Sequence, residues 1–164
     1  MAFLQATLTS LQAWEWLGIL LARLVVGLLF FLTGYGKLFR ADAAAKMLQT
    51  LQEAGIPFPR VSAVAVSAVE FVCGALLVLG ALTPLASLML AADMVVAIAT
   101  VNARHIHSTS PSDWLSKFLY LPQLLYVVLL VWIFFAGPGW LSVDQAVLGT
   151  FKGQPRALPA LTQP

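Results

Sequence analysis

Three charged side chains lie inside the most apolar parts of this 164-residue sequence, where they could do chemistry. Arg23, Glu70 and Asp93 each interrupt a long hydrophobic run, and a charge in such a run is costly unless it has a partner or a function. Glu70 and Asp93 each lie about ten residues into their runs, near the middle of a bilayer-spanning helix of about 20 residues. The long side chain of Arg23 can cover most of the remaining depth. We therefore expect the three groups to meet in one cluster.

The charge balance of this cluster suggests a chemical role. One arginine facing two carboxyls leaves an excess of negative charge at low dielectric, so Glu70 or Asp93 is expected to hold a proton at neutral pH. Such a carboxyl could relay protons or donate a hydrogen bond to a quinone-like carbonyl. A second interpretation is that the cluster only holds three helices together, because buried ion networks often specify packing without chemistry.

Further polar side chains fall on the same helical faces and extend the candidate site. Tyr120, Gln123 and Tyr126 share one face of the last hydrophobic run, and Ser67 lies one turn before the glutamate. Lys37 lies near the end of the first run, where we expect its side chain to extend to the membrane interface and not to join the cluster.

Other reactive residue types give weaker signals. Cys73 is the only cysteine, so it cannot form an intramolecular disulfide, and we expect it to pack as a small apolar residue. His105 and His107 lie near Asp113 at a spacing that is poor for a metal site, and a solvated loop is the simpler interpretation. The sequence contains no motif for covalent haem attachment or for a phosphate-binding loop. We expect no metal and no covalent cofactor.

The composition identifies the environment in which these residues act. Hydrophobic residues make up 60% of the chain and charged residues 10%, whereas soluble domains carry about 45–50% and about 25%. The lipid bilayer is therefore the expected partner, and the net charge of +2 does not suggest nucleic acid. The apolar runs are continuous, which excludes the alternating strands of a membrane barrel and requires helices.

The hydrophobic runs predict an all-α fold, an antiparallel four-helix bundle within the membrane. The four spans are expected at about residues 17–39, 60–80, 83–103 and 115–136. They form one domain over residues 1–148, followed by a loosely ordered tail at 149–164. Between the first two spans, apolar residues recur at helical spacing and predict a short interfacial amphipathic helix, at Ala44, Met47, Leu48 and Leu51.

Basic residues predict the orientation of the bundle. The side with the loops between spans one and two and between spans three and four carries Lys37, Arg40, Lys46, Arg60, Arg104 and Lys117. The other side carries only Lys152 and Arg156. Because basic residues favour the cytoplasmic side, we expect a multi-pass protein of the cell (inner) membrane with both termini outside the cytoplasm.

Four segments, in this order, carry a resemblance to a known family: ARLVVGLLFFLTGYGKLF, EAGIPFP, EFVCGALLVLGALTPLASLMLAADM and GPGWLSVDQAV. From about Leu21 to Leu148 the chain resembles the DoxX family of small four-helix membrane proteins. The resemblance carries the family's glutamate onto Glu70, and its closing motif onto Gly137, Pro138, Gly139, Ser142 and Asp144. Pro84 stands where family members often have a basic residue. Asp93 has no counterpart in these motifs, so its role depends on the physical argument alone.

The resemblance implies two classes of function. Relatives include a small subunit of a thiosulfate:quinone oxidoreductase and a membrane component of a mycobacterial redox-stress complex, and more distant ones are similar to membrane chaperones for receptors. The first hypothesis is a quinone- or proton-linked subunit or accessory of a membrane oxidoreductase complex. It would have a soluble or membrane oxidoreductase partner, quinone as a non-covalent ligand, and could be a homo-oligomer. The alternative is a non-enzymatic assembly, chaperone or scaffold protein whose intramembrane charges are structural. The sequence does not decide whether the chain is itself an enzyme, and solute transport is disfavoured because no inverted repeat is evident.

Overall fold

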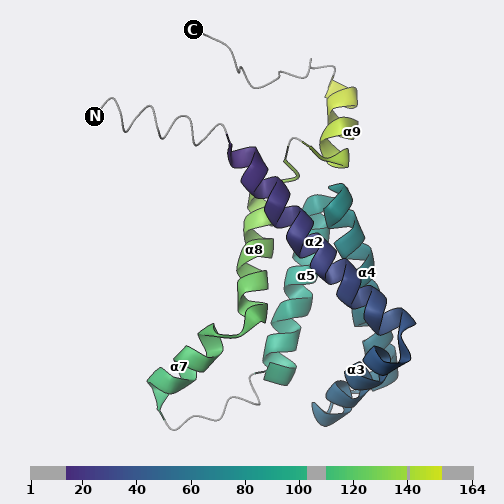
Figure 1. The fold of residues 1–164 in the computed structure, drawn as a ribbon, viewed down its shortest axis with the longest axis vertical. Helices are drawn as coiled ribbons and strands as arrows, with labels where there is room; N and C mark the ends of the chain where they lie inside the picture. The colour runs from purple at the N-terminus through teal and green to yellow at the C-terminus, as the bar shows by residue number, and fades with distance from the viewer. Residues whose placement is uncertain (1–13, 103–109, 140, 153–164) are drawn as a thin grey trace.

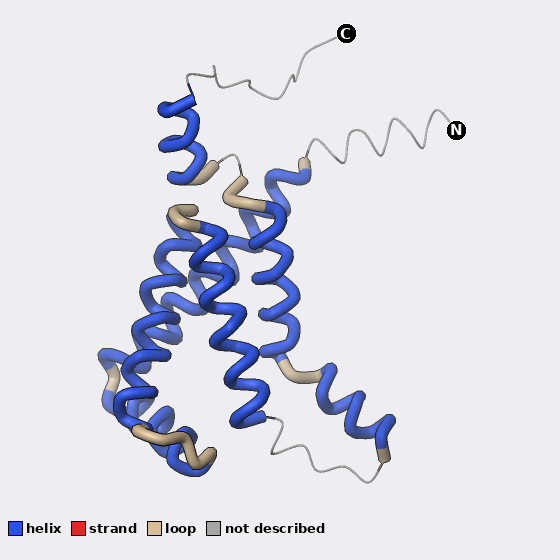
Figure 2. The backbone as a smooth tube through the Cα atoms, turned by 180° about the vertical axis from the view of Figure 1, so that it is seen from behind, coloured by secondary structure: helices blue, strands red, loops and turns tan. Residues whose placement is uncertain are grey.

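The computed structural model describes residues 14–102, 110–139 and 141–152, and all regular elements in these ranges are helical (Figure 1; Figure 2). They are α2 (Glu15–Phe39), α3 (Ala41–Glu53), α4 (Pro59–Leu79), α5 (Thr83–Ala97), the π-helical turn η1 (Ile98–Asn102), α7 (Pro111–Leu119), α8 (Pro122–Ala136) and α9 (Val143–Lys152). The predicted all-α class is confirmed.

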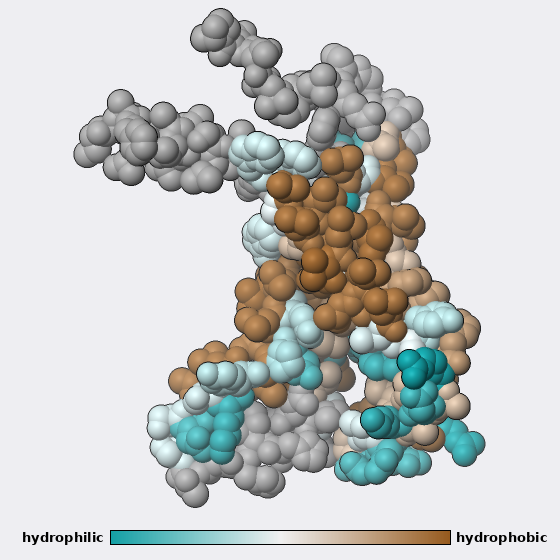
Figure 3. All heavy atoms as spheres, viewed as in Figure 1, coloured by the Kyte–Doolittle hydropathy of each residue, from teal (hydrophilic) through white to brown (hydrophobic). Residues whose placement is uncertain are grey.

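Three helical segments are long and apolar enough to cross a membrane: Trp16–Phe39, Pro59–Leu79 and Thr83–Thr100. They match the first three predicted spans, although the third passes from α5 into a π-helical turn before its end. Leucines on their outer faces are exposed, as expected of side chains that contact lipid. Figure 3 shows apolar residues across the middle of the molecule and more polar ones over α3 and α7.

The fourth predicted span, 115–136, is not one continuous helix. α7 and α8 meet at an angle of 59°, and Leu121 between them has an extended backbone. Pro122 explains the break, because its ring fixes its own backbone, removes an N–H donor and disfavours a helical conformation at the residue before it. The prediction of a single continuous helix was wrong at this point: α7 and α8 are long and apolar enough to cross a membrane only together, as a bent pair.

Glycines allow α2 and α4 to pack with their backbones almost in contact. A Cβ atom at Gly34 would lie 2.8 Å from the Cα of Phe71 and 2.9 Å from the carbonyl oxygen of Ser67, and one at Gly27 would lie 2.9 Å from the nitrogen of Val78. The contact moves backward along α4 as it moves forward along α2, so these two helices run in opposite directions. Such close approach increases van der Waals contact between helices in lipid.

Replacing Gly34 with alanine is expected to force these two helices apart. The added methyl group would meet backbone atoms that cannot rotate away, and overpacking of this kind typically costs about 1–3 kcal/mol. We expect a lower thermal midpoint of the detergent-solubilised protein. Gly36→Ala is the matched control, because no atom lies within 4 Å of a Cβ built on Gly36. Equal midpoints for the two variants would contradict the close crossing.

α3 connects α2 to α4 and packs on both. An extended Arg40 ends α2. Leu51 on α3 and Ala54 directly after it are buried, while Asp42 and Lys46 are exposed. A helix therefore occupies the stretch where the sequence predicts one, and its position at the membrane interface stays a prediction.

The apolar core lies where α2, α4, α5 and α8 meet. It includes Val26, Phe30, Leu77, Leu90 and Leu130, all at most 2% exposed. In Figures 1 and 2 the helices lie closer together near α9 than near α3 and α7. We refer to these two ends of the bundle as the α9 end and the α3 end.

Candidate functional site

A cavity of about 640 Å³ lies toward the α3 end of the bundle. Its walls come from α2, α3 and α4 on one side and from α5, η1 and α8 on the other, and most of the lining is apolar. Ligand pockets typically have volumes of about 300–1,000 Å³ and an apolar lining with a few polar groups. The polar side chains in the wall are Thr33, Lys37, Thr50, Ser62, Glu70, Asp93, Thr100, Gln123 and Tyr126. Figure 3 shows the molecule hollowed beside α3.

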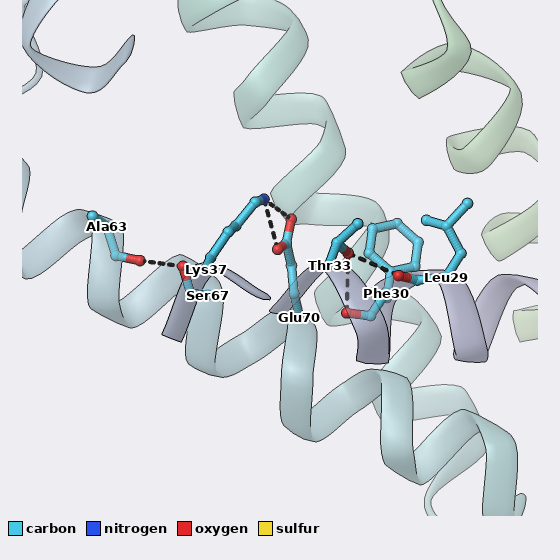
Figure 4. A network of polar contacts seen from close by, with 7 residues as sticks. All are labelled: Leu29, Phe30, Thr33, Lys37, Ala63, Ser67 and Glu70. Atoms are coloured by element: carbon cyan, nitrogen blue, oxygen red, sulfur yellow. Dashed lines mark hydrogen bonds and ion pairs between the residues drawn. The ribbon is translucent and has the colours of Figure 1, made fainter. Parts of the chain in front are cut away.

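An ion pair between α2 and α4 forms part of the cavity wall (Figure 4). The Nζ atom of Lys37 lies 2.7 Å from each carboxylate oxygen of Glu70. The Glu70 side chain is 3% exposed and that of Lys37 is 26% exposed, so the pair is largely removed from solvent. The sequence-based expectation that Lys37 extends to the interface was wrong. It is the basic partner of Glu70.

Two hydroxyl groups next to this pair donate hydrogen bonds to backbone carbonyl oxygens of their own helices. Ser67 donates to the carbonyl oxygen of Ala63 at 2.7 Å, and Thr33 donates to that of Leu29 at 2.8 Å (Figure 4). Ser67 is buried and does not line the cavity, whereas Thr33 does. The structure therefore does not bring Ser67 into the site with Glu70, although the two side chains share α4.

The opposite wall contributes Asp93 from α5, with Gln123 and Tyr126 from α8. The Oδ2 atom of Asp93 and the Oε1 atom of Gln123 are buried and have no hydrogen-bond partner among the described residues. Asp93 lies within electrostatic range of Glu70 and Lys37. The Tyr126 ring packs edge-on against Phe30, with ring centroids 5.8 Å apart. Glu70, Asp93, Gln123 and Tyr126 thus line one cavity.

Arg23 does not join these groups. Its guanidinium donates hydrogen bonds to the carbonyl oxygens of Pro138 and Leu141, in the segment that follows α8. The side chain of Arg23 is buried and interacts electrostatically with Asp144. The expected cluster of Arg23, Glu70 and Asp93 was wrong: Arg23 lies at the α9 end, where α2 passes the turn between α4 and α5.

Asp144 binds the start of α5 at the same end. Its carboxylate oxygens accept hydrogen bonds from the backbone nitrogens of Leu82 at 2.7 Å and Thr83 at 2.9 Å, and its own nitrogen donates to the carbonyl oxygen of Gly80 at 2.9 Å. Leu82 has a φ of 49°, a left-handed conformation that is costly for a residue with a side chain. We call the set of Arg23, Gly80, Leu82, Thr83, Pro138, Leu141 and Asp144 the clasp.

Sequence reasoning did not assign a structural role to Asp144. The available signal was Ser142 three residues before Gln145, a spacing typical of a helix N-terminus. In the structure Ser142 caps α9, because the nitrogen of Gln145 donates to Oγ of Ser142 at 3.1 Å.

Several other predicted features lie outside the cavity or outside the described residues. Tyr120 is 87% exposed at the end of α7 and does not line the cavity, because the break before Pro122 turns it away from Gln123 and Tyr126. α9 continues to Lys152, past the predicted start of the tail at 149. His105, His107 and residues 153–164 are outside the described residues. Within the described part, no group of three or more His, Cys, Asp or Glu side chains is placed to hold a metal ion.

Comparison with known proteins gives one match. The sequence model of the DoxX family matches residues 18–103, just over half of the chain. No curated protein and no solved structure matches the sequence. The matched region runs from α2 to η1 and contains Lys37, Glu70 and Asp93, whereas Gln123, Tyr126 and Asp144 lie beyond it.

Proposed function

The chain belongs to the DoxX family of membrane proteins, and on this premise we propose that it is a quinone-linked membrane subunit of an oxidoreductase complex. The family is linked to membrane oxidoreductases. The observation that carries the proposal is the cavity at the α3 end, which combines an apolar lining with buried polar atoms that have no partner in the described part of the chain. A buried polar atom without a partner is costly, and a bound ligand can remove this cost.

The chemistry of the cavity fits a quinone head group. A quinone presents carbonyl oxygens that need hydrogen-bond donors at the end of a flat, apolar ring. The amide of Gln123, the hydroxyl of Tyr126 and a protonated Asp93 could supply donors. Bound there, the quinone would accept electrons and protons, and the electrons would come from a soluble or membrane oxidoreductase partner.

The orientation of the cavity is part of the proposal. The basic residues Lys37, Arg40, Lys46 and Arg60 lie at the end of α2, between α2 and α3, on α3 and at the start of α4, toward the α3 end. By the positive-inside rule this end faces the cytoplasm, which places both termini outside it in the cell (inner) membrane. The cavity would then exchange protons with the cytoplasmic side.

A second function is favoured by how the charges are used. Glu70 is paired with Lys37, and Arg23 and Asp144 hold the clasp together, so these four side chains already have structural roles that need no ligand. A membrane assembly or scaffold protein with a lipid-filled cavity would look the same at these positions. Buried atoms without a partner in the described part of the chain also occur in the clasp, at Arg23 Nε and Thr83 Oγ1, but in the cavity lining they are those of Asp93 and Gln123, and these argue for a specific ligand.

Quinone binding to the purified protein in lipid nanodiscs tests the proposal. We expect saturable binding of decylubiquinone or menadione, measured by calorimetry. The Ala97→Phe variant should bind these quinones at least about tenfold more weakly, since each ~1.4 kcal/mol of lost interaction lowers the affinity tenfold. Ala97 lines the cavity, so phenylalanine would fill it.

Ala92→Phe is the matched control. Ala92 lies on the same helix but is exposed on its outer face and does not line the cavity. We expect this variant to bind quinone like the unmodified protein. If the unmodified protein binds neither quinone, the assembly function is favoured. Equal weakening by both phenylalanines would argue against the cavity as the site.

A further inference from the structure

The two walls of the cavity use their polar groups differently. On the α2 and α4 wall, Lys37 and Glu70 satisfy each other at 2.7 Å, and Thr33 bonds to its own helix. On the α5 and α8 wall, Asp93 Oδ2 and Gln123 Oε1 are buried and find no partner within residues 14–102, 110–139 and 141–152. The polar groups that the fold does not use are therefore gathered on one side of the cavity.

The charged groups of the cavity also distinguish the side formed by α5 and α8. The Lys37 ammonium contacts both oxygens of Glu70, so this pair is neutral as a unit. Asp93 is the second carboxyl in the cavity lining, within electrostatic range of that pair and of Cys73, and its buried Oδ2 atom accepts no hydrogen bond from the described residues. A carboxyl in this position changes its proton occupancy more readily than one that is ion-paired.

We propose that Asp93 and Gln123 form the head-group subsite of the cavity, and that the protonation of Asp93 selects the oxidation state of the bound ligand. This inference rests on the proposed quinone function. A protonated Asp93 donates a hydrogen bond, so it favours the carbonyl of a quinone. An ionised Asp93 accepts one, so it favours the hydroxyl of a quinol. The ion pair of Lys37 and Glu70 lines the opposite side of the cavity and takes no part in this selection.

The surroundings of Asp93 make it the group that should govern this response. Among the described residues, the titratable or charged groups that face it are Lys37 from α2, Glu70 and Cys73 from α4, and Tyr126 from α8. Lys37 and Glu70 are paired with each other. Gln123, which completes the subsite, does not titrate at all.

The experiment measures the affinity of decylubiquinone and of its reduced quinol in nanodiscs between about pH 5 and about pH 9, the range in which buried carboxyls titrate. In the unmodified protein, quinone affinity should fall by about tenfold as pH rises and quinol affinity should rise by about the same factor, as expected for a hydrogen bond to a charged group. Asp93→Asn should bind both forms with no such pH dependence, because asparagine donates and accepts at every pH.

Gln123→Met is the second variant, and it keeps the test decisive if Asp93→Asn folds poorly. This variant should lower the affinities for quinone and for quinol by a similar factor. The affinity for quinone should still fall with rising pH, and that for quinol should still rise. Persistence of the pH dependence in a folded Asp93→Asn variant would overturn the inference and assign the titration to another group. Flat profiles in the unmodified protein would also overturn it, while leaving quinone binding intact. Absence of quinone binding in the unmodified protein would instead refute the proposed function and this inference with it.

Discussion

Replacing Glu70 with glutamine is expected to lower the yield and the thermal midpoint of the protein together. The Lys37 ammonium, now 2.7 Å from both carboxylate oxygens, would face a neutral amide in a largely buried position. Breaking a buried ion pair by removing one partner typically costs about 3–5 kcal/mol. Lys37→Met should be similarly harmful. Midpoints of detergent-solubilised protein, measured by light scattering and intrinsic fluorescence, would provide the comparison.

Two further variants separate the pair from general effects. The double variant Lys37→Met with Glu70→Leu removes both charges and should recover much of the loss, because apolar replacement of a buried pair is often close to neutral. Glu53→Gln is the control: Glu53 is exposed on α3 and accepts a hydrogen bond from Gln49 at 2.8 Å, so its replacement should change stability by no more than about 0.5 kcal/mol. An unchanged midpoint for Glu70→Gln would show that the ion pair does not stabilise the bundle.

Replacing Arg23 with methionine is expected to open the clasp at the α9 end. Methionine keeps an unbranched apolar stem but is shorter than arginine, and it leaves the carbonyl oxygens of Pro138 and Leu141 without the guanidinium. A hydrogen bond to a charged group contributes roughly 1.5–3 kcal/mol, so loss of two should be readily measured as a lower thermal midpoint. Protease cleavage in the segment after α8 should accelerate at the same time.

Arg40→Met is the matched control for this substitution. Arg40 pairs with Asp42 at 3.2 Å, but both side chains are exposed, at 67% and 71%. The charge of Arg40 lowers the pKa of Asp42, so the expected response is a return of that pKa toward its ordinary value with little change in stability. If Arg23→Met were as harmless as Arg40→Met, the clasp would not hold the end of the bundle.

Hydropathy predicted the first three spans because each needs only a long apolar run. The short turn after α4 was also predicted, because the spans at 60–80 and 83–103 leave only two residues between them. In the structure Gly80 ends the helix in a left-handed conformation with a φ of 68°. The fourth span was predicted less well. Pro122 was visible in the sequence, but hydropathy does not report the direction of the chain on either side of a proline.

The partners of the charged residues could not be predicted, because they depend on how α2 and α4 are aligned. Depth in the membrane alone made Arg23 and Glu70 plausible neighbours. The glycine contacts set a different alignment, in which Gly34 meets Phe71 and Gly27 meets Val78. With this register Arg23 falls beside the turn after α4, and Lys37 lies close enough to reach Glu70. Long charged side chains can each reach several partners, so they do not fix how two helices are aligned against each other.

The broken fourth span has a consequence for the surrounding lipid. α2 has 25 residues and α8 has 15, which at ~1.5 Å per residue gives lengths of about 37 Å and about 22 Å. A hydrocarbon core of about 30 Å is shorter than the first helix and longer than the second. α2 can tilt to fit, whereas the bilayer must thin beside α8 or draw α7 inward, each at a cost of a fraction of a kcal/mol per Å. Hydrophobic mismatch would therefore differ around the perimeter of the protein, and thicker membranes would favour arrangements in which a neighbouring protein, not lipid, covers the α8 side.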